Sequence, residues 1–169
     1  MQVRLSKCSI SSAEINAVTQ VLESEFLGMG SKVVEFEQSI KQYLDTNMDV
    51  VCVNTGTSAL QLALSALNIQ EGDEVLVPSL TYIATFQAIS AMGAIPIACE
   101  VNSDTLFIDV HDAETRVTPR TRVIMPVHYA SSSKGMSDVY VFAKKYQLRV
   151  IEDAAQAFGC FQDGNKVGV

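Results

Sequence analysis

Short apolar runs alternate with longer amphipathic stretches along most of the chain. Five runs rich in Val or Ile are typical of buried parallel strands; they span residues 50–53, 74–77, 95–99, 122–127 and 149–152. Five stretches have helical spacing of their apolar positions; they span residues 11–23, 33–44, 58–67, 82–92 and 136–146. Strands that alternate with helices favour a mostly parallel sheet covered on both faces. The pattern predicts an α/β fold with three layers, αβα.

Polar residues and glycines mark several of these predicted boundaries. Ser11 and Glu14 have the spacing of a capping box at the start of the first helix. Gly72 and Gly93 precede the second and third predicted strands, as turn residues do. We expect a helical segment over residues 1–45 and a cofactor-binding α/β domain over residues 46–169.

Charge and hydropathy argue against two kinds of partner. The chain has 19 Asp and Glu against 12 Lys and Arg, a formal net charge of -7, and so offers no broad basic surface to nucleic acid. No apolar segment of secretory length begins the chain, and polar residues, Gly93 and Pro96 interrupt the apolar stretch 83–98. We expect a cytoplasmic protein that binds neither membranes nor nucleic acid.

The four cysteines indicate neither a metal site nor a disulfide framework. They are widely spaced, they include no Cys-x-x-Cys pair, and the chain has only two histidines. Cys52 lies within one apolar run and Cys99 ends another. We interpret them as small hydrophobic residues in a reducing compartment.

Candidate chemistry begins after the first predicted strand, because ligands bind at the carboxyl ends of strands in open α/β sheets. Gly56, Thr57 and Ser58 lie there at a helix start. Free N–H groups, hydroxyls and the positive end of the helix dipole favour an anion such as phosphate. The simpler alternative is that Thr57 or Ser58 caps the helix. The segment matches neither a Walker loop nor Gly-x-Gly-x-x-Gly, so ATP and NAD are not favoured.

An aromatic and an acidic residue follow two other strands. Tyr82, after the second strand, could stack on a planar ring or could pack on the core. Asp153 follows the fifth strand, with two alanines after it and Gln156 one helical turn further on. An Asp in this position can pair with the ring nitrogen of pyridoxal phosphate. Asp153 as an ordinary N-cap is the alternative, although it does not explain the alanines.

The two histidines differ in their surroundings. His128 follows the fourth strand, where it could transfer protons, contact a substrate or bind its own loop, and the last is the commonest role of a single His. His111 lies in a polar stretch with Asp109 and Asp112, so we expect it at the surface. His128 is therefore a candidate catalytic residue.

Taken together, these segments resemble a known family. The segment 54–60, then GDEVLVPSLTYIAT, TPRTRVIMPVHY and VIEDAAQAFG, in this order and spacing, look like the DegT-type sugar aminotransferases, which aminate keto groups of nucleotide-linked sugars. The early stretch GMGSKVVEFEQSIKQYL is similar to the N-terminal region of that family. The likeness extends over nearly the whole chain.

The resemblance implies a fold type I, pyridoxal 5′-phosphate (PLP) dependent enzyme that works as a homodimer. It implies that Thr57 and Ser58 hold the cofactor phosphate and that Tyr82 stacks on the pyridine ring. It also implies that Asp153 pairs with the ring nitrogen and that Gln156 contacts the ring on its hydroxyl side. The reaction implied is transfer of an amino group from an amino acid, commonly glutamate, to a keto-sugar nucleotide.

The sequence also departs from that family. Neither Lys134 nor Lys166 matches the lysine that forms the Schiff base with PLP, and the segment 130–135 differs from the Leu-Tyr-Gly-like segment usual after the histidine. We therefore expect a truncated chain, incomplete at its C-terminus and inactive by itself. Two alternatives stay open: a non-catalytic interaction or dimerisation module, and a PLP-dependent sugar dehydratase relative.

Overall fold

The computed structural model describes residues 7–162 and 164–168 of the protein. The chain divides into two compact units, residues 1–51 and residues 52–169. Among the described residues, no helix is long and apolar enough to cross a membrane.

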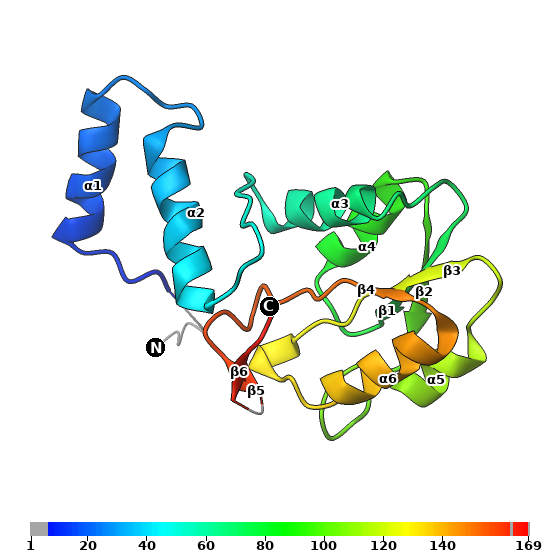
Figure 1. Ribbon diagram of the computed structural model, residues 1–169. Coiled ribbons are helices and arrows are strands. Elements are labelled where there is room, and N and C mark those ends of the chain that lie inside the picture. The colour runs from blue at the N-terminus through cyan, green and yellow to red at the C-terminus, as the bar shows by residue number, and fades with distance from the viewer. Residues whose placement is uncertain (1–6, 163, 169) are drawn as a thin grey trace, which may run out of the picture. The chain divides into compact units, whose positions relative to one another are not determined.

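The first unit contains two helices, α1 (Ser12–Glu23) and α2 (Ser31–Leu44) (Figure 1). Both were predicted, and the capping box is confirmed: the Ala13 amide donates to Ser11 Oγ at 3.2 Å and the Ser11 amide to Glu14 Oε2 at 2.6 Å. No residue in the described part of this unit, 7–51, is buried. The described part of this unit therefore has no buried core of its own, and α1 is supported by its capping box.

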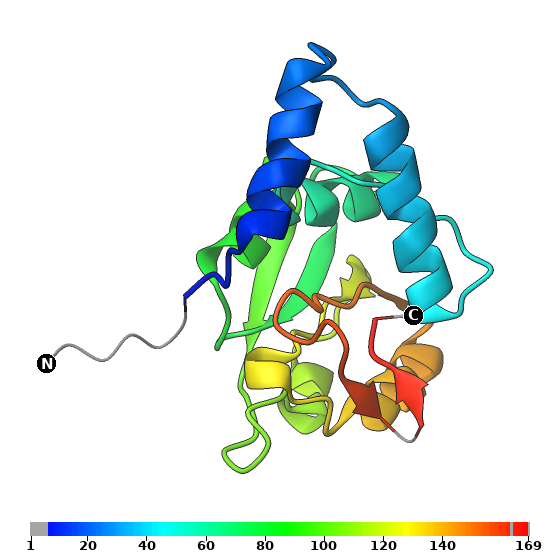
Figure 2. The same cartoon turned by 90° about the vertical axis from the view of Figure 1, so that its left-hand side faces the viewer.

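The second unit is built on a four-stranded parallel sheet in the order β2-β1-β3-β4. The strands are β1 (Glu74–Pro78), β2 (Ile95–Cys99), β3 (Thr121–Ile124) and β4 (Arg149–Val150). The helices are α3 (Gly56–Ala66), α4 (Ile83–Ala91), α5 (Val110–Thr115) and α6 (Met136–Tyr146). A hairpin of β5 (Phe161–Gln162) and β6 (Asn165–Lys166) lies apart from the sheet (Figure 2). The predicted α/β class is confirmed.

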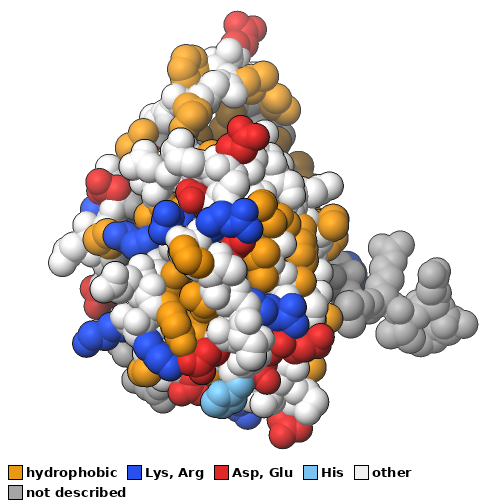
Figure 3. Space-filling view, turned by 90° about the vertical axis from the view of Figure 1, so that its right-hand side faces the viewer, with side chains coloured by type: hydrophobic (Ala, Val, Ile, Leu, Met, Phe, Trp, Pro, Cys, Tyr) orange, Lys and Arg blue, Asp and Glu red, His pale blue; other side chains and the backbone are white. Residues whose placement is uncertain are grey.

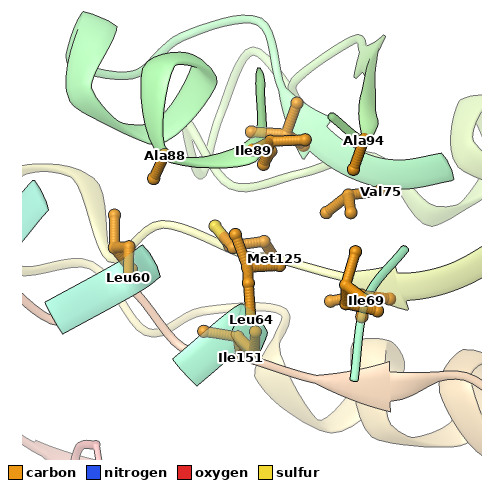
Figure 4. Packing of buried hydrophobic residues seen from close by; sticks show 11 residues of the cluster. Leu60, Leu64, Ile69, Val75, Ala88, Ile89, Ala94, Met125 and Ile151 are labelled. Carbon is orange, nitrogen blue, oxygen red and sulfur yellow. The ribbon is translucent and has the colours of Figure 1, made fainter. Parts of the chain in front are cut away.

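Alternation along the strands produces the three layers. Val75 and Val77 of β1 pack with Leu64 of α3 and Ile89 of α4 on one face of the sheet, as Figure 4 shows in part. Leu76, between them in β1, joins the opposite cluster, which contains Ala113 of α5 and Val139, Phe142 and Ala143 of α6. A strand buried on both faces needs apolar residues at every position, which is why these runs were continuous in the sequence.

The prediction of a first strand over residues 50–53 is wrong. Val51 and Val53 are 63% and 40% exposed, and the run pairs with none of the described strands. An apolar run becomes a strand only where a neighbour completes its backbone hydrogen bonds. The predicted strand 122–127 is also shorter, since Pro126 has no N–H to donate and only a bridge between Val127 and Asp153 continues the pairing.

Three small elements were not predicted: α5, the 3-10 helix η1 (Tyr129–Ser131) and the hairpin β5–β6. Each is too short for hydrophobic periodicity to reveal it, because α5 has six residues, η1 has three and each hairpin strand has two. His111 of α5 is exposed, as expected.

Ion pairs gather at the amino ends of the strands. Arg120 Nη2 lies 2.6 Å from Glu74 Oε1, and Arg122 Nε lies 3.4 Å from Asp73 Oδ1. Figure 3, a view toward this end of the sheet, shows Lys and Arg side chains interspersed with Asp and Glu. The amino end is thus a surface of paired charges, and the candidate site lies at the opposite end.

Candidate functional site

A cavity of about 380 Å³ lies at the carboxyl ends of the strands. The connection after β1 leads through α4 to β2 on one side of β1, whereas β3 pairs on its other side. Such a reversal of strand order opens a crevice in which α/β proteins bind ligands. The residues that line the cavity include Gly56, Thr57, Thr81, Tyr82, Asp153 and Gln156. The structure thus brings together most of the site residues that were predicted, from three separate segments.

The start of α3 supplies hydrogen-bond donors. Thr55, not Thr57 or Ser58, caps the helix: its side chain accepts from the Ser58 amide at 3.1 Å and its hydroxyl donates to Ser58 Oγ at 3.0 Å. Among the described residues, the amides of Gly56 and Thr57 have no acceptor, and both residues line the cavity. Two free N–H groups at a helix N-terminus attract an anion.

Gly56 leaves this approach open. A Cβ atom at Gly56 would have no heavy atom within 4 Å, so nothing in the described structure fills the space in front of the amide. Ser58 contributes less than expected, because its side chain is bonded to Thr55 and it does not line the cavity. The residues present therefore fit a phosphate group held by Gly56 and Thr57.

Asp153 faces the same cavity from the carboxyl end of β4. Backbone bonds fix it: the His128 amide donates to the Asp153 carbonyl at 3.0 Å, and the Asp153 amide donates to the Pro126 carbonyl at 2.9 Å. Its carboxylate accepts from the Thr85 hydroxyl at 3.2 Å and from the Ala155 amide at 3.2 Å. No cation pairs with it within the described chain. The carboxylate is available to a cationic group of a ligand.

Tyr82 immediately precedes α4 and is 74% exposed. Its packing on the core, the alternative considered from the sequence, is therefore wrong. The side chain lines the cavity together with Thr57 and Asp153 and presents an aromatic ring to it. An exposed ring beside a cavity suits stacking on a planar ligand.

Gln156 lies in a turn, not on the helix that the sequence suggested. Its Oε1 accepts from the Ala130 amide at 2.9 Å, and its carbonyl accepts from the Ser131 hydroxyl at 2.6 Å. Ala130 and Ser131 both have positive φ, 49° and 67°, a conformation that costs non-glycine residues energy. Gln156 thus holds a strained turn at the edge of the cavity, and its amide nitrogen remains a donor for a ligand.

His128 is buried at 1% exposure and does not line the cavity. Its Nε2 lies 2.8 Å from Glu152 Oε2, and its Nδ1 lies 3.2 Å from the Ser132 carbonyl. His128 binds its own loop, the commonest of the roles considered, and supports the cavity wall from behind.

Glu152 and Tyr140 complete this group. The Tyr140 hydroxyl donates to Glu152 Oε1. Burial acts to raise the pKa of Glu152, but the hydrogen bonds from His128 and Tyr140 outweigh it and hold the pKa below its usual value. Burial, with the bond to Glu152, raises the pKa of Tyr140 to about 12. Glu152 lines the cavity with both oxygens bonded to His128 and Tyr140, beside Asp153, which pairs with no cation among the described residues.

Sequence reasoning missed several residues of this region, among them Thr55, Thr85 and Glu152. Thr55 carries no local signal that separates it from Thr57 or Ser58, because Ser and Thr are all good caps. Nothing local points Thr85 at Asp153, 68 residues away. Nor does anything local pair Glu152 with His128, 24 residues away.

The fold and this site define a class. The three-layer parallel arrangement is that of the large domain of fold type I PLP-dependent transferases. The protein belongs to the DegT/DnrJ/EryC1/StrS aminotransferase family, whose sequence model matches residues 8–169.

Solved structures agree with this assignment. DesV of S. venezuelae is 40% identical, with a TM-score of 0.88 over 94% of this chain and 43% of DesV. NtdA of Bacillus subtilis, solved with bound PMP, is 35% identical, with a TM-score of 0.83 over 89% of this chain and 34% of NtdA. Spr1654 of Streptococcus pneumoniae, solved in a PMP form, is 30% identical, with a TM-score of 0.93 over 99% of this chain and 46% of its own. The chain thus spans less than half the length of each.

Proposed function

We propose that residues 52–169 form the PLP-binding part of an aminotransferase that acts on nucleotide-linked keto sugars. One observation carries the proposal: a single cavity has two amides, of Gly56 and Thr57, that find no acceptor among the described residues, and a carboxylate, Asp153, that finds no cation among them. PLP has a phosphate to match the first and a ring nitrogen to match the second. When bound, PLP acts as an electron sink for the substrate carbon.

Each residue has a distinct task in this proposal. The Gly56 and Thr57 amides hold the phosphate, and the Thr57 hydroxyl is available as a further donor. Tyr82 covers one face of the ring, Asp153 holds the protonated ring nitrogen, and the Gln156 amide nitrogen donates toward the ring hydroxyl. Glu152 does not compete for the ring nitrogen, because His128 and Tyr140 already occupy its oxygens.

The substrates are proposed from the relatives. Spr1654 is described as a sugar aminotransferase, which supports a sugar acceptor for this protein. We propose an amino acid such as glutamate as the donor. We propose that residues 1–169 alone do not transfer amino groups, because no lysine among the described residues lines the cavity.

Titration of the purified chain with PLP, followed by absorbance, tests the cofactor site. Asp153→Ala and Thr57→Ala should each weaken saturable binding, and Asp138→Ala, at an exposed position of α6, should not. Borohydride should trap no adduct at a specific lysine. Wild-type protein that is folded yet does not bind PLP contradicts the proposal for this chain, as does binding unaffected by Asp153→Ala.

A second proposal concerns partners. In α1, Ile15, Val18 and Leu22 are each between 57% and 60% exposed and recur at helical spacing. An apolar stripe of this kind favours association, and we propose a homo-oligomer in solution. Light scattering after size-exclusion chromatography tests it: a Val18→Lys variant should have a smaller mass than the wild type, and a monomeric wild type contradicts it.

A further inference from the structure

A pair of hydroxyl groups lies behind Asp153 in the cavity wall. Thr85 of α4 is fully buried, and its Oγ1 donates to Asp153 Oδ2 at 3.2 Å. Thr81, one turn earlier, lines the cavity, and its Oγ1 lies 2.8 Å from Thr85 Oγ1. The three side chains form a chain of hydrogen bonds from the cavity surface to the carboxylate.

The direction of this chain follows from proton counting. A hydroxyl has one proton, and Thr85 uses its proton for Asp153. The proton between the two threonines must then come from Thr81. Thr81 therefore presents only lone pairs to the cavity, and each bond polarises the next.

We propose that Thr85 is a positioning residue for Asp153. The Asp153 backbone is fixed by its bridge to Val127. Among the described residues its side chain is held by two bonds, from Thr85 to Oδ2 and from the Ala155 amide, two residues away, to Oδ1. The bond from Thr85 is the one that comes from another element of the fold. It fixes the orientation of the carboxylate, and so where a cationic ring nitrogen is received.

The same protein contains a matched control at the other end of the sheet. Thr121 is buried at 5% exposure, and its Oγ1 donates to Glu74 Oε2 at 3.2 Å. Thr121→Val removes the same kind of buried hydrogen bond to a carboxylate without touching the cavity. Any effect that Thr85→Val produces through general destabilisation should also appear in Thr121→Val.

This inference rests on the proposed function for its ligand, so the experiment has two readouts. In PLP titrations of the full chain, Thr85→Val should weaken binding roughly tenfold, because a hydrogen bond to a charged group is lost. Thr85→Ser should bind PLP as tightly as the wild type, and so should Thr121→Val. Because Thr85 acts through Asp153, adding Thr85→Val to Asp153→Ala should weaken binding no further.

Crystal structures without PLP give the second readout. The Asp153 side chain should keep one conformation in wild type and Thr85→Ser and leave it in Thr85→Val. If wild type fails to bind PLP, the proposed function fails, and the conformation of Asp153 still decides the role of Thr85. An unchanged Asp153 in Thr85→Val, or a Thr85→Ser variant that binds as poorly as Thr85→Val, overturns the inference. If Thr85→Val does not fold, Thr85→Ala takes its place in both readouts.

Discussion

His128 Nε2 lies 2.8 Å from Glu152 Oε2, directly behind the cavity wall that contains Asp153. The two neighbouring carboxylates are therefore not equivalent. The two oxygens of Glu152 are bonded by the His128 and Tyr140 side chains. Asp153 accepts from the Thr85 hydroxyl and the Ala155 amide. A cationic ligand group entering the cavity is directed to Asp153 by this difference.

Replacing only His128 should lower the free energy of unfolding more than replacing both His128 and Glu152. His128→Gln leaves a mostly buried carboxylate without its partner, and we expect a loss of about 3–5 kcal/mol in the free energy of unfolding. Adding Glu152→Gln should recover much of that loss. Urea unfolding of both single variants and the double variant measures the coupling. Strictly additive effects contradict the pairing.

Ala130→Gly should stabilise the protein. Ala130 has φ of 49°, where glycine avoids a steric cost of about 1–2 kcal/mol that exceeds its entropic disadvantage of about 0.5–1 kcal/mol. The expected net gain is about 0.5–1 kcal/mol in urea unfolding. Ala66→Gly, at the last residue of α3, is the control and should destabilise instead. A loss of stability in Ala130→Gly contradicts the strained turn.

Leu64 should be a main support of the core between α3 and the sheet. It is fully buried (Figure 4), and Leu64→Ala should cost about 2–5 kcal/mol, from lost apolar burial and the cavity left behind. Leu62, in the same helix, is 48% exposed, so Leu62→Ala should cost less than about 1 kcal/mol. Equal losses in chemical denaturation contradict the packing of α3.

Glu74 should make stability depend on pH in the acid range. Hydrogen bonds from Thr118 and Arg120 hold the pKa of Glu74 below its usual value, against the effect of burial. The unfolded chain therefore binds this proton at a higher pH than the folded chain. The contribution is present above the unfolded pKa and is lost as pH falls through the folded pKa.

Comparison with Glu74→Gln isolates this contribution. The wild type should be more stable than Glu74→Gln by about 1–3 kcal/mol at pH 7, and the difference should shrink as pH falls below about 4.5. Glu71→Gln, at an exposed position, should remain close to the wild type throughout. A difference that stays constant down to pH 2 contradicts the assignment.

By itself, the sequence determined the layers of the second unit and the segments that form its site. Continuous apolar runs at β1 and β3, and periodic apolar positions in α3, α4 and α6, reflect burial, because a buried face needs apolar residues at matching positions. The positions of Tyr82 and Asp153 followed from one topological rule, that loops after parallel strands meet at one edge.

Only the tertiary structure decided how the side chains divide the work. Val50 to Val53 have strand composition but belong to neither sheet of the described residues, since pairing is a relation between segments. Composition could not separate Thr55 from Thr57 as the cap or draw Thr85 to Asp153, nor could it place His128 behind the wall. A hydrogen bond depends on distances of a few tenths of an ångström between elements far apart in the chain. Those distances are set by the packing of helices on the sheet.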